Sequence, residues 1–145
     1  MSEEQHEEDS VEHVGGTTTV EPVYDYYLMV QAKLLDTLDE DSSIGMSLNV
    51  AGGMVSGLLI SRATWEKRWV AEVAAADENL GEILESVVGA LDEHENSKAD
   101  SEPEPNRFVH MKDAMFISGS TRLDLGLWRA PMAQIAGWSN AMFKA

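Results

Sequence analysis

A glycine pair between two short apolar segments is the feature that most limits the folds open to this chain. Residues 45–50 show the alternation of a strand, and 54–61 form a second apolar segment after the tight turn at 51–53. Such a turn joins antiparallel neighbours, so the segments predict a β-hairpin. The second segment is apolar on both faces, which favours a central strand. Gly57 within it indicates a bend or a close approach of two backbones.

Apolar spacing predicts the remaining elements. We expect a helix at 22–39, a helical stretch at 62–91 interrupted near 77–79, a long strand at 108–118, and one or two closing strands within 125–138 that Pro131 breaks or places at an edge. Sequential strands with a helix between the second and third favour an α+β fold. The expected sheet is antiparallel, has four to five strands and curves into a small, partly open barrel of the SH3-like or Sm-like kind, with helices flanking it.

Two acidic segments interrupt this pattern. Residues 1–20 contain six acidic residues and neither lysine nor arginine, and residues 92–106 are acidic, polar and proline-bearing. Neither segment buries enough apolar area to offset the entropy lost on ordering it. Because 145 residues suit one domain, we expect a disordered arm at 1–20 and a single domain at 21–145 that contains a flexible loop at 92–106.

The formal net charge of −16, from 26 acidic and 10 basic side chains, restricts the partners of the protein. Such a surface repels nucleic acid phosphates and anionic lipid headgroups. The sequence has no cysteine, no basic leader before an apolar run, and no apolar stretch near the roughly 18 residues that a membrane span needs. We therefore expect a cytoplasmic protein that binds neither nucleic acid nor membrane. Two explanations of the acidity stay open: a role in binding basic partners, or adaptation to a salty cytoplasm.

The usual nucleophiles and bases do not combine into a recognisable catalytic site. Ser56 lacks the spacing of the Gly-x-Ser-x-Gly elbow, so we expect a strand hydroxyl. No two of the histidines have the i, i+4 spacing that directs both at one metal: His6, His13, His94 and His110. His110 lies between apolar residues of a predicted strand, where a hydrogen-bonded structural histidine is expected.

Metal and phosphate motifs are incomplete as well. The acidic group at Asp36, Asp39 and Asp41 lacks the loop and final glutamate that wrap calcium, which favours a solvated helix end. Gly52 and Gly53 lack the further glycines and the lysine of a phosphate loop. The sequence therefore predicts no catalytic, cofactor-binding or metal-binding residue, no cofactor, and a protein that is not an enzyme.

The tryptophans have two possible roles. Trp65 and Trp69 recur four residues apart and could offer an aromatic docking face, but a helix that packs them against the sheet is the stronger expectation. The same interpretation applies to Trp128 and Trp138.

Two blocks of the sequence resemble the gas vesicle accessory protein U family. The first, within 45–72, contains Gly45-Met46-Ser47-Leu48-Asn49-Val50 and Val55-Ser56-Gly57-Leu58-Leu59-Ile60-Ser61 before an aromatic-bearing helix. The second, within 107–143, contains Phe108-Val109-His110-Met111-Lys112, similar to the family strand Phe-Ile-His-Leu-Lys, then Trp128-Arg129-Ala130 and Ile135-Ala136-Gly137-Trp138. An acidic loop separates the blocks, as in the family. The N-terminal extension, with the helix at 22–39, and Pro131 depart from the pattern.

The resemblance implies an accessory protein outside the vesicle shell. Such a protein would act in gas vesicle assembly or clustering, and would contact gas vesicle proteins or further copies of itself as a homo-oligomer. The residues leave two alternatives open. An acidic binding chaperone for a secreted or assembling partner would dock through the helix at 24–38 or a sheet edge. An Sm-like RNA-binding barrel is opposed by the charge.

Overall fold

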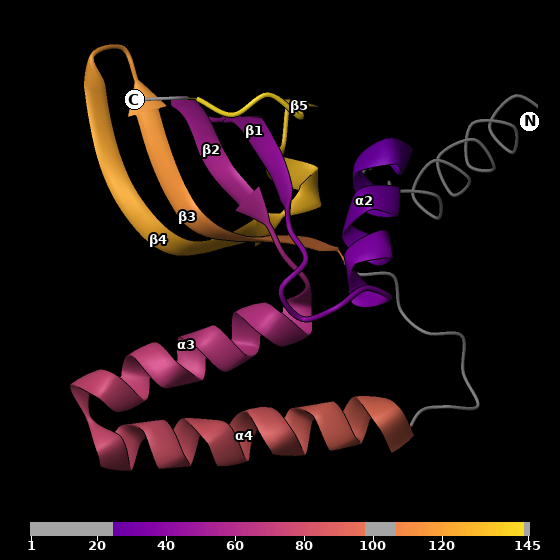
Figure 1. Ribbon diagram of the computed structural model, residues 1–145, viewed down its shortest axis with the longest axis vertical. Coiled ribbons are helices and arrows are strands. Elements are labelled where there is room, and N and C mark those ends of the chain that lie inside the picture. Colours follow the sequence, from indigo (N-terminus) through magenta and orange to yellow (C-terminus); the bar gives the residue numbers. More distant parts are fainter. Residues whose placement is uncertain (1–24, 98–106, 144–145) are drawn as a thin grey trace, which may run out of the picture.

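The computed structural model describes residues 25–97 and 107–143 (Figure 1). In chain order the elements are α2 (Tyr26–Asp36), β1 (Ile44–Val50), β2 (Gly53–Leu59), α3 (Arg62–Ala76), α4 (Glu78–Ser97), β3 (Phe108–Ser118), β4 (Thr121–Pro131), the 3-10 helix η1 (Met132–Gln134) and β5 (Gly137–Ser139). The predicted arm at 1–20 and most of the predicted loop, 98–106, lie outside the described residues. The division into an arm and one domain therefore stays a prediction.

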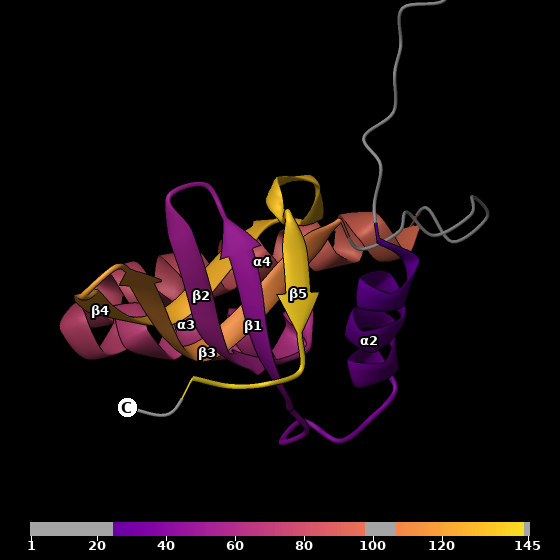
Figure 2. The same ribbon diagram turned by 90° about the horizontal axis from the view of Figure 1, so that it is seen from above.

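The strands form one antiparallel sheet in the order β4-β3-β2-β1-β5. β1 and β2 are the predicted hairpin, with Leu48 opposite Val55 and Gly52 at a φ of +87° in the turn. β4 and β5 are the two edge strands, so the sheet is open. Figure 1 and Figure 2 show that it is also curved. Pro131 ends β4 at an edge, where no ladder bond from its nitrogen is needed. The predicted α+β class and curved antiparallel sheet are confirmed.

α2 and η1 pack on one face of the sheet, and the main core lies between them and that face. Every second residue of each strand points to this face, and α2 contributes the residues along one of its sides. The buried cluster consists of Leu28, Ala32, Leu35, Met46, Leu48, Val55, Leu59, Val109, Met111, Ala114 and Met132. Trp128 and Trp138 pack against it and are half-buried, as predicted. Each fully buried leucine in this cluster stabilises the fold by about 1.5–3 kcal/mol, so the core accounts for the stability of the sheet region.

Gly57 allows two neighbouring strands to approach closely. The pairing of β2 with β3 shifts register at this residue. A Cβ atom on Gly57 would lie 3.0 Å from the Ala114 Cα and 3.0 Å from the Lys112 carbonyl oxygen. Both are backbone atoms, which cannot move aside as a flexible side chain could. The predicted close approach is confirmed, and the irregularity adds to the bend of the sheet.

Helices α3 and α4 form an antiparallel pair that lies beside the sheet (Figure 1). They pack most closely where Gly81 meets Ala74, since a Cβ on Gly81 would lie 2.5 Å from the Ala74 Cβ. Asp77 separates the helices, and its Oδ1 accepts the Leu80 N–H at 3.2 Å. The pair contacts the sheet mainly through α3, which lies against β3 and β4.

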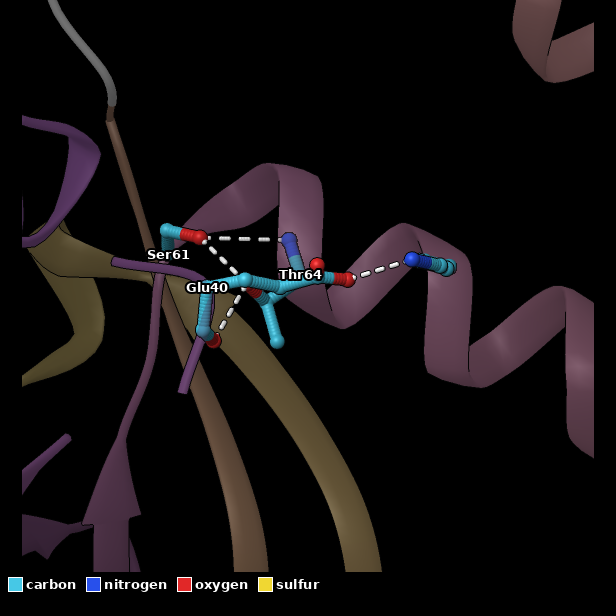
Figure 3. A network of polar contacts seen from close by, with 4 residues as sticks. Glu40, Ser61 and Thr64 are labelled. Atoms are coloured by element: carbon cyan, nitrogen blue, oxygen red, sulfur yellow. Dashed lines mark hydrogen bonds and ion pairs between the residues drawn. The ribbon is translucent and has the colours of Figure 1, made fainter. Parts of the chain in front are cut away.

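A polar network fixes the start of α3 against the loop that follows α2 (Figure 3). Ser61 Oγ accepts the Thr64 N–H at 3.1 Å, which caps the helix. The Thr64 hydroxyl donates to the Glu40 carbonyl oxygen at 3.0 Å. The carboxylate of Glu40 lies 2.6 Å from the Lys67 ammonium. The network therefore joins the start of α3 to the loop that follows α2.

Two predicted helix boundaries need correction. α2 is shorter than 22–39, because the chain enters it through Asp25, whose Oδ1 accepts the Leu28 N–H at 3.0 Å, and leaves it after Asp36. α4 continues to Ser97, so the first part of the predicted loop at 92–106 is helical. Its Asp92 Oδ1 lies 4.0 Å from an Arg62 nitrogen on α3. Composition alone had predicted a loop for this part of α4. The predicted break near 77–79 is confirmed.

Candidate functional site

Ser56 is a structural hydroxyl in the middle of β2. It is buried, its Oγ accepts the Phe143 N–H at 2.7 Å, and it lies 3.1 Å from the Ser47 Oγ. The Ser47 hydroxyl in turn donates to the Ala141 carbonyl oxygen at 2.6 Å. The two serines therefore hold the C-terminal segment on the sheet face opposite the main core.

The other residues considered for chemistry are dispersed. His6 and His13 lie outside the described residues, His94 is exposed on α4, and His110 is buried in β3. Asp36, Asp39 and Asp41 are exposed around the end of α2; partial burial raises the pKa of Asp36, against the lowering effect of Arg62. Within 25–97 and 107–143, no three His, Asp or Glu side chains come together as a metal site.

His110 is buried without the hydrogen bond that the sequence suggested. Its imidazole contacts the Trp65 ring, with ring centroids 5.5 Å apart, and no hydrogen bond joins it to another side chain in the described part of the chain. Burial, together with the nearby charges of Arg129 and Arg62, lowers its pKa to about 3. The ring is therefore neutral at physiological pH.

The paired tryptophans of α3 have different environments. Trp65 is 8% exposed and packs against the sheet at His110, as predicted. Trp69 is 37% exposed, so its packing prediction was wrong. The sequence could not distinguish them, because a spacing of four residues puts both on one side of α3 but does not give the distance of each from the sheet.

An apolar stripe runs along one side of α4 and is largely exposed to solvent, although its last residue, Leu91, also lies beside Arg62 and Trp65 of α3. Its residues are spaced by three, four and four positions, which places them on one side of a helix. They are Leu80 (53% exposed), Ile83 (61%), Val87 (49%) and Leu91 (57%). Leu84 and Val88, the half-buried residues of the same helix, face α3. We call the four exposed residues the α4 stripe.

The charges around the α4 stripe have one sign. α4 contains no lysine or arginine. Its acidic residues are Glu78, Glu82, Glu85, Asp92, Glu93 and Glu95. The α4 stripe thus combines apolar contact area with an acidic border. The sequence had shown apolar residues on more than one side of this helix, but not that one of these sides would remain uncovered.

A second exposed apolar face lies on α2. Leu28, Ala32 and Leu35 face the core, while Tyr27, Val30 and Leu34 face outward and are exposed, as is Leu38 just after the helix. No helix within the described ranges has the length and apolar character that crossing a membrane requires.

A family model described as gas vesicle protein GvpU-like matches residues 25–142. The chain belongs to this GvpU-like family. It is therefore a gas vesicle-associated protein. The match includes α2, so the prediction that this helix lies outside the family pattern was wrong. Searches of curated proteins and of solved structures return no significant match.

Proposed function

We propose that this member of the GvpU-like family is a non-enzymatic accessory factor that acts in gas vesicle assembly or clustering by contacting other proteins. The observation that carries the proposal is the α4 stripe. Four large apolar side chains on one side of a helix, each about half exposed or more, exceed the scattered single residues that ordinary surfaces show. We place the protein in the cytoplasm, at the vesicles.

The energetics favour weak contacts that act together. Removing half of a large aliphatic side chain from water stabilises a complex by about 1 kcal/mol, so the α4 stripe supplies about 4 kcal/mol. The lost freedom of two associating molecules costs at least as much. One such contact is therefore transient, and lasting association requires several contacts on one assembly. A vesicle surface, with many identical copies of its components, provides that multiplicity.

Both vesicle proteins and further copies of this chain suit the α4 stripe as partners. Two copies paired through α4 would bring acidic borders together, which opposes association at low ionic strength. A vesicle protein with basic residues beside an apolar segment would avoid that repulsion. Self-association should accordingly depend on salt.

The exposed face of α2 supports an alternative function. An acidic binding chaperone would need a solvent-facing helix to hold an assembling partner, and Tyr27, Val30 and Leu34 are exposed on such a helix. Substitutions on α2 distinguish the alternatives: loss of function from changes on α2, with changes on α4 tolerated, would favour the chaperone.

The test uses cells in which the gene is deleted and then restored. The double variant Ile83→Ser/Val87→Ser removes the middle of the α4 stripe without touching the packing on α3. Leu123→Ser is the matched control, because Leu123 is a leucine of similar exposure (56%) on β4. We expect the control to restore vesicle number and clustering and the double variant to fail. Full restoration by the double variant, or no effect of the gene deletion, would contradict the proposal.

A further inference from the structure

A cavity lies where α3 crosses β3 and β4 and α4 passes alongside. Its volume is about 260 Å³. It is lined by two arginines, a glutamate, a histidine, two tryptophans and two aliphatic residues, and the polar ones that matter are Arg62, Glu66, His110 and Arg129. His110 and Arg129 are directly opposite each other in the β3–β4 pairing, so both project from the same sheet face toward α3.

Arg129 has no acidic partner in this cavity. Its Cζ lies 4.1 Å from the centroid of the Phe108 ring and 5.6 Å from that of Trp65, so aromatic rings hold the guanidinium in place. No ion pair or hydrogen bond of Arg129 forms with the residues at 25–97 or 107–143. Burial lowers the pKa of Arg129 and the charge of Arg62 lowers it further, with Glu66 opposing both. Arg129 is an exposed residue, so its N–H donors are open to solvent or to a ligand.

Arg62 differs, although it lines the same cavity. Its Nε donates to Glu66 Oε1 at 3.0 Å, and Asp92 lies 4.0 Å from its other end. Glu66 is therefore paired with Arg62, although its charge still favours the charged form of Arg129.

Another donor in the cavity wall also has no acceptor. Trp65 is 8% exposed, and its indole Nε1 has no hydrogen-bond partner in the described chain. Protein atoms enclose this nitrogen, so it is an unpaired donor of the fold and not one that the cavity exposes to a ligand. The neutral imidazole of His110 adds a polar group without adding charge. Trp69, Val88 and Leu91 complete the cavity as an apolar wall.

We propose that this cavity binds a carboxylate attached to a small apolar group, with Arg129 as the group that recognises the charge. A planar guanidinium matches the two oxygens of a carboxylate, and one free arginine balances one negative charge. A phosphate dianion fits less well, because only Arg129 is free and Glu66 lies nearby. The cavity is slightly smaller than the roughly 300–1,000 Å³ of common ligand pockets, so it suits a short acid or the end of a peptide.

The first test titrates the full chain with hexanoate, 1-hexanol and hexylammonium by calorimetry, with tryptophan fluorescence as a second readout. The three probes share an apolar chain and differ in the charge of the head. We expect saturable binding of hexanoate and at least about tenfold weaker binding of the other two. No binding of hexanoate, or equal binding of hexanol, would overturn the proposal.

The second test compares two arginines of β4. Arg129→Gln should weaken hexanoate binding at least about tenfold. Arg122→Gln is the matched control: Arg122 also lies over an aromatic ring, 4.4 Å from the centroid of Phe143, but it is not a cavity residue. Trp69→Ala should weaken hexanoate and leave acetate unchanged, since it removes only apolar wall. Unchanged affinity in Arg129→Gln, or equal losses in both arginine variants, would contradict the assignment.

A competition experiment distinguishes the two sources of such a carboxylate. A peptide ending in leucine is compared with its C-terminal amide as a competitor of hexanoate. Displacement by the acid alone assigns the site to the chain end of a protein, whereas resistance to both assigns it to a free small acid. Displacement by acid and amide alike would overturn the role of the carboxylate. The measurements use purified protein without vesicles, so their outcome is independent of the proposed function.

Discussion

The sheet region and the α3–α4 pair use their apolar residues in opposite ways. In the sheet, α2 and η1, the core residues are buried, from Met46 and Leu48 at 0% exposure to Ala32 at 5%. Between residues 78 and 95 of α4, only Gly81 is buried, while the leucine, isoleucine and valine of the α4 stripe face water. The difference indicates that the sheet region maintains the fold and that the helical pair presents a surface.

The largest expected effect comes from adding a side chain inside the sheet. Gly57→Val places a branched side chain against the backbone of Ala114 and Lys112, which cannot yield. We expect a loss of about 3 kcal/mol or more, seen as a fall of about 10 °C or more in melting temperature. Ser56→Ala, the neighbouring control, loses one acceptor and should cost about 1 kcal/mol. A melting temperature unchanged by the valine would remove the close-approach role of Gly57.

The next effect concerns His110, which joins the two regions through its contact with Trp65. Its pKa is 6.5 in the unfolded chain and about 3 in the folded one. As pH falls from 6.5 toward 3, the unfolded chain takes up a proton that the folded protein does not, so stability falls with pH in this window. Between pH 7 and pH 5 the loss is about 2 kcal/mol.

His110→Gln is the control for this pH dependence. Urea melts of both proteins between pH 7 and pH 5 isolate the histidine, because most carboxylates titrate at lower pH. The variant should lose this part of the slope. Identical slopes in the two proteins would show that His110 is not held neutral in the fold.

A smaller effect is expected from a substitution that should loosen the helical pair and leave the sheet unchanged. Gly81→Ala should force α4 away from Ala74, because its Cβ would lie 2.5 Å from that of Ala74. Gly89→Ala on the same helix meets nothing within 4 Å and should stabilise α4 by up to about 1 kcal/mol through helix propensity. Hydrogen exchange should show faster exchange in α4 for the first variant and unchanged protection in β1–β3. Loss of protection in the strands would mean that the two regions fold as one unit.

The same contrast explains which features the sequence could predict. The hairpin at Gly52 and the long strand at 108–118 depend on local alternation and turn chemistry, and both were predicted to within about two residues. The helical course of residues 92–97 was not predicted, because the acidic, polar composition of this segment is typical of a loop. The cavity arises because Arg129 and His110 face each other across two strands and meet α3, an arrangement that requires the register and the helix position.

The most direct test of the account is light scattering of the purified full chain against salt, with the Ile83→Ser/Val87→Ser variant and the Leu123→Ser control. Raising salt from about 0.1 M to 1 M shortens the screening length from about 10 Å to about 3 Å and so reduces the repulsion between acidic borders. We predict that self-association of the parent and of Leu123→Ser rises with salt, and that the double variant stays largely monomeric. Dissociation by salt, or association of the double variant equal to that of the parent, would contradict the central claim that the α4 stripe is the contact surface.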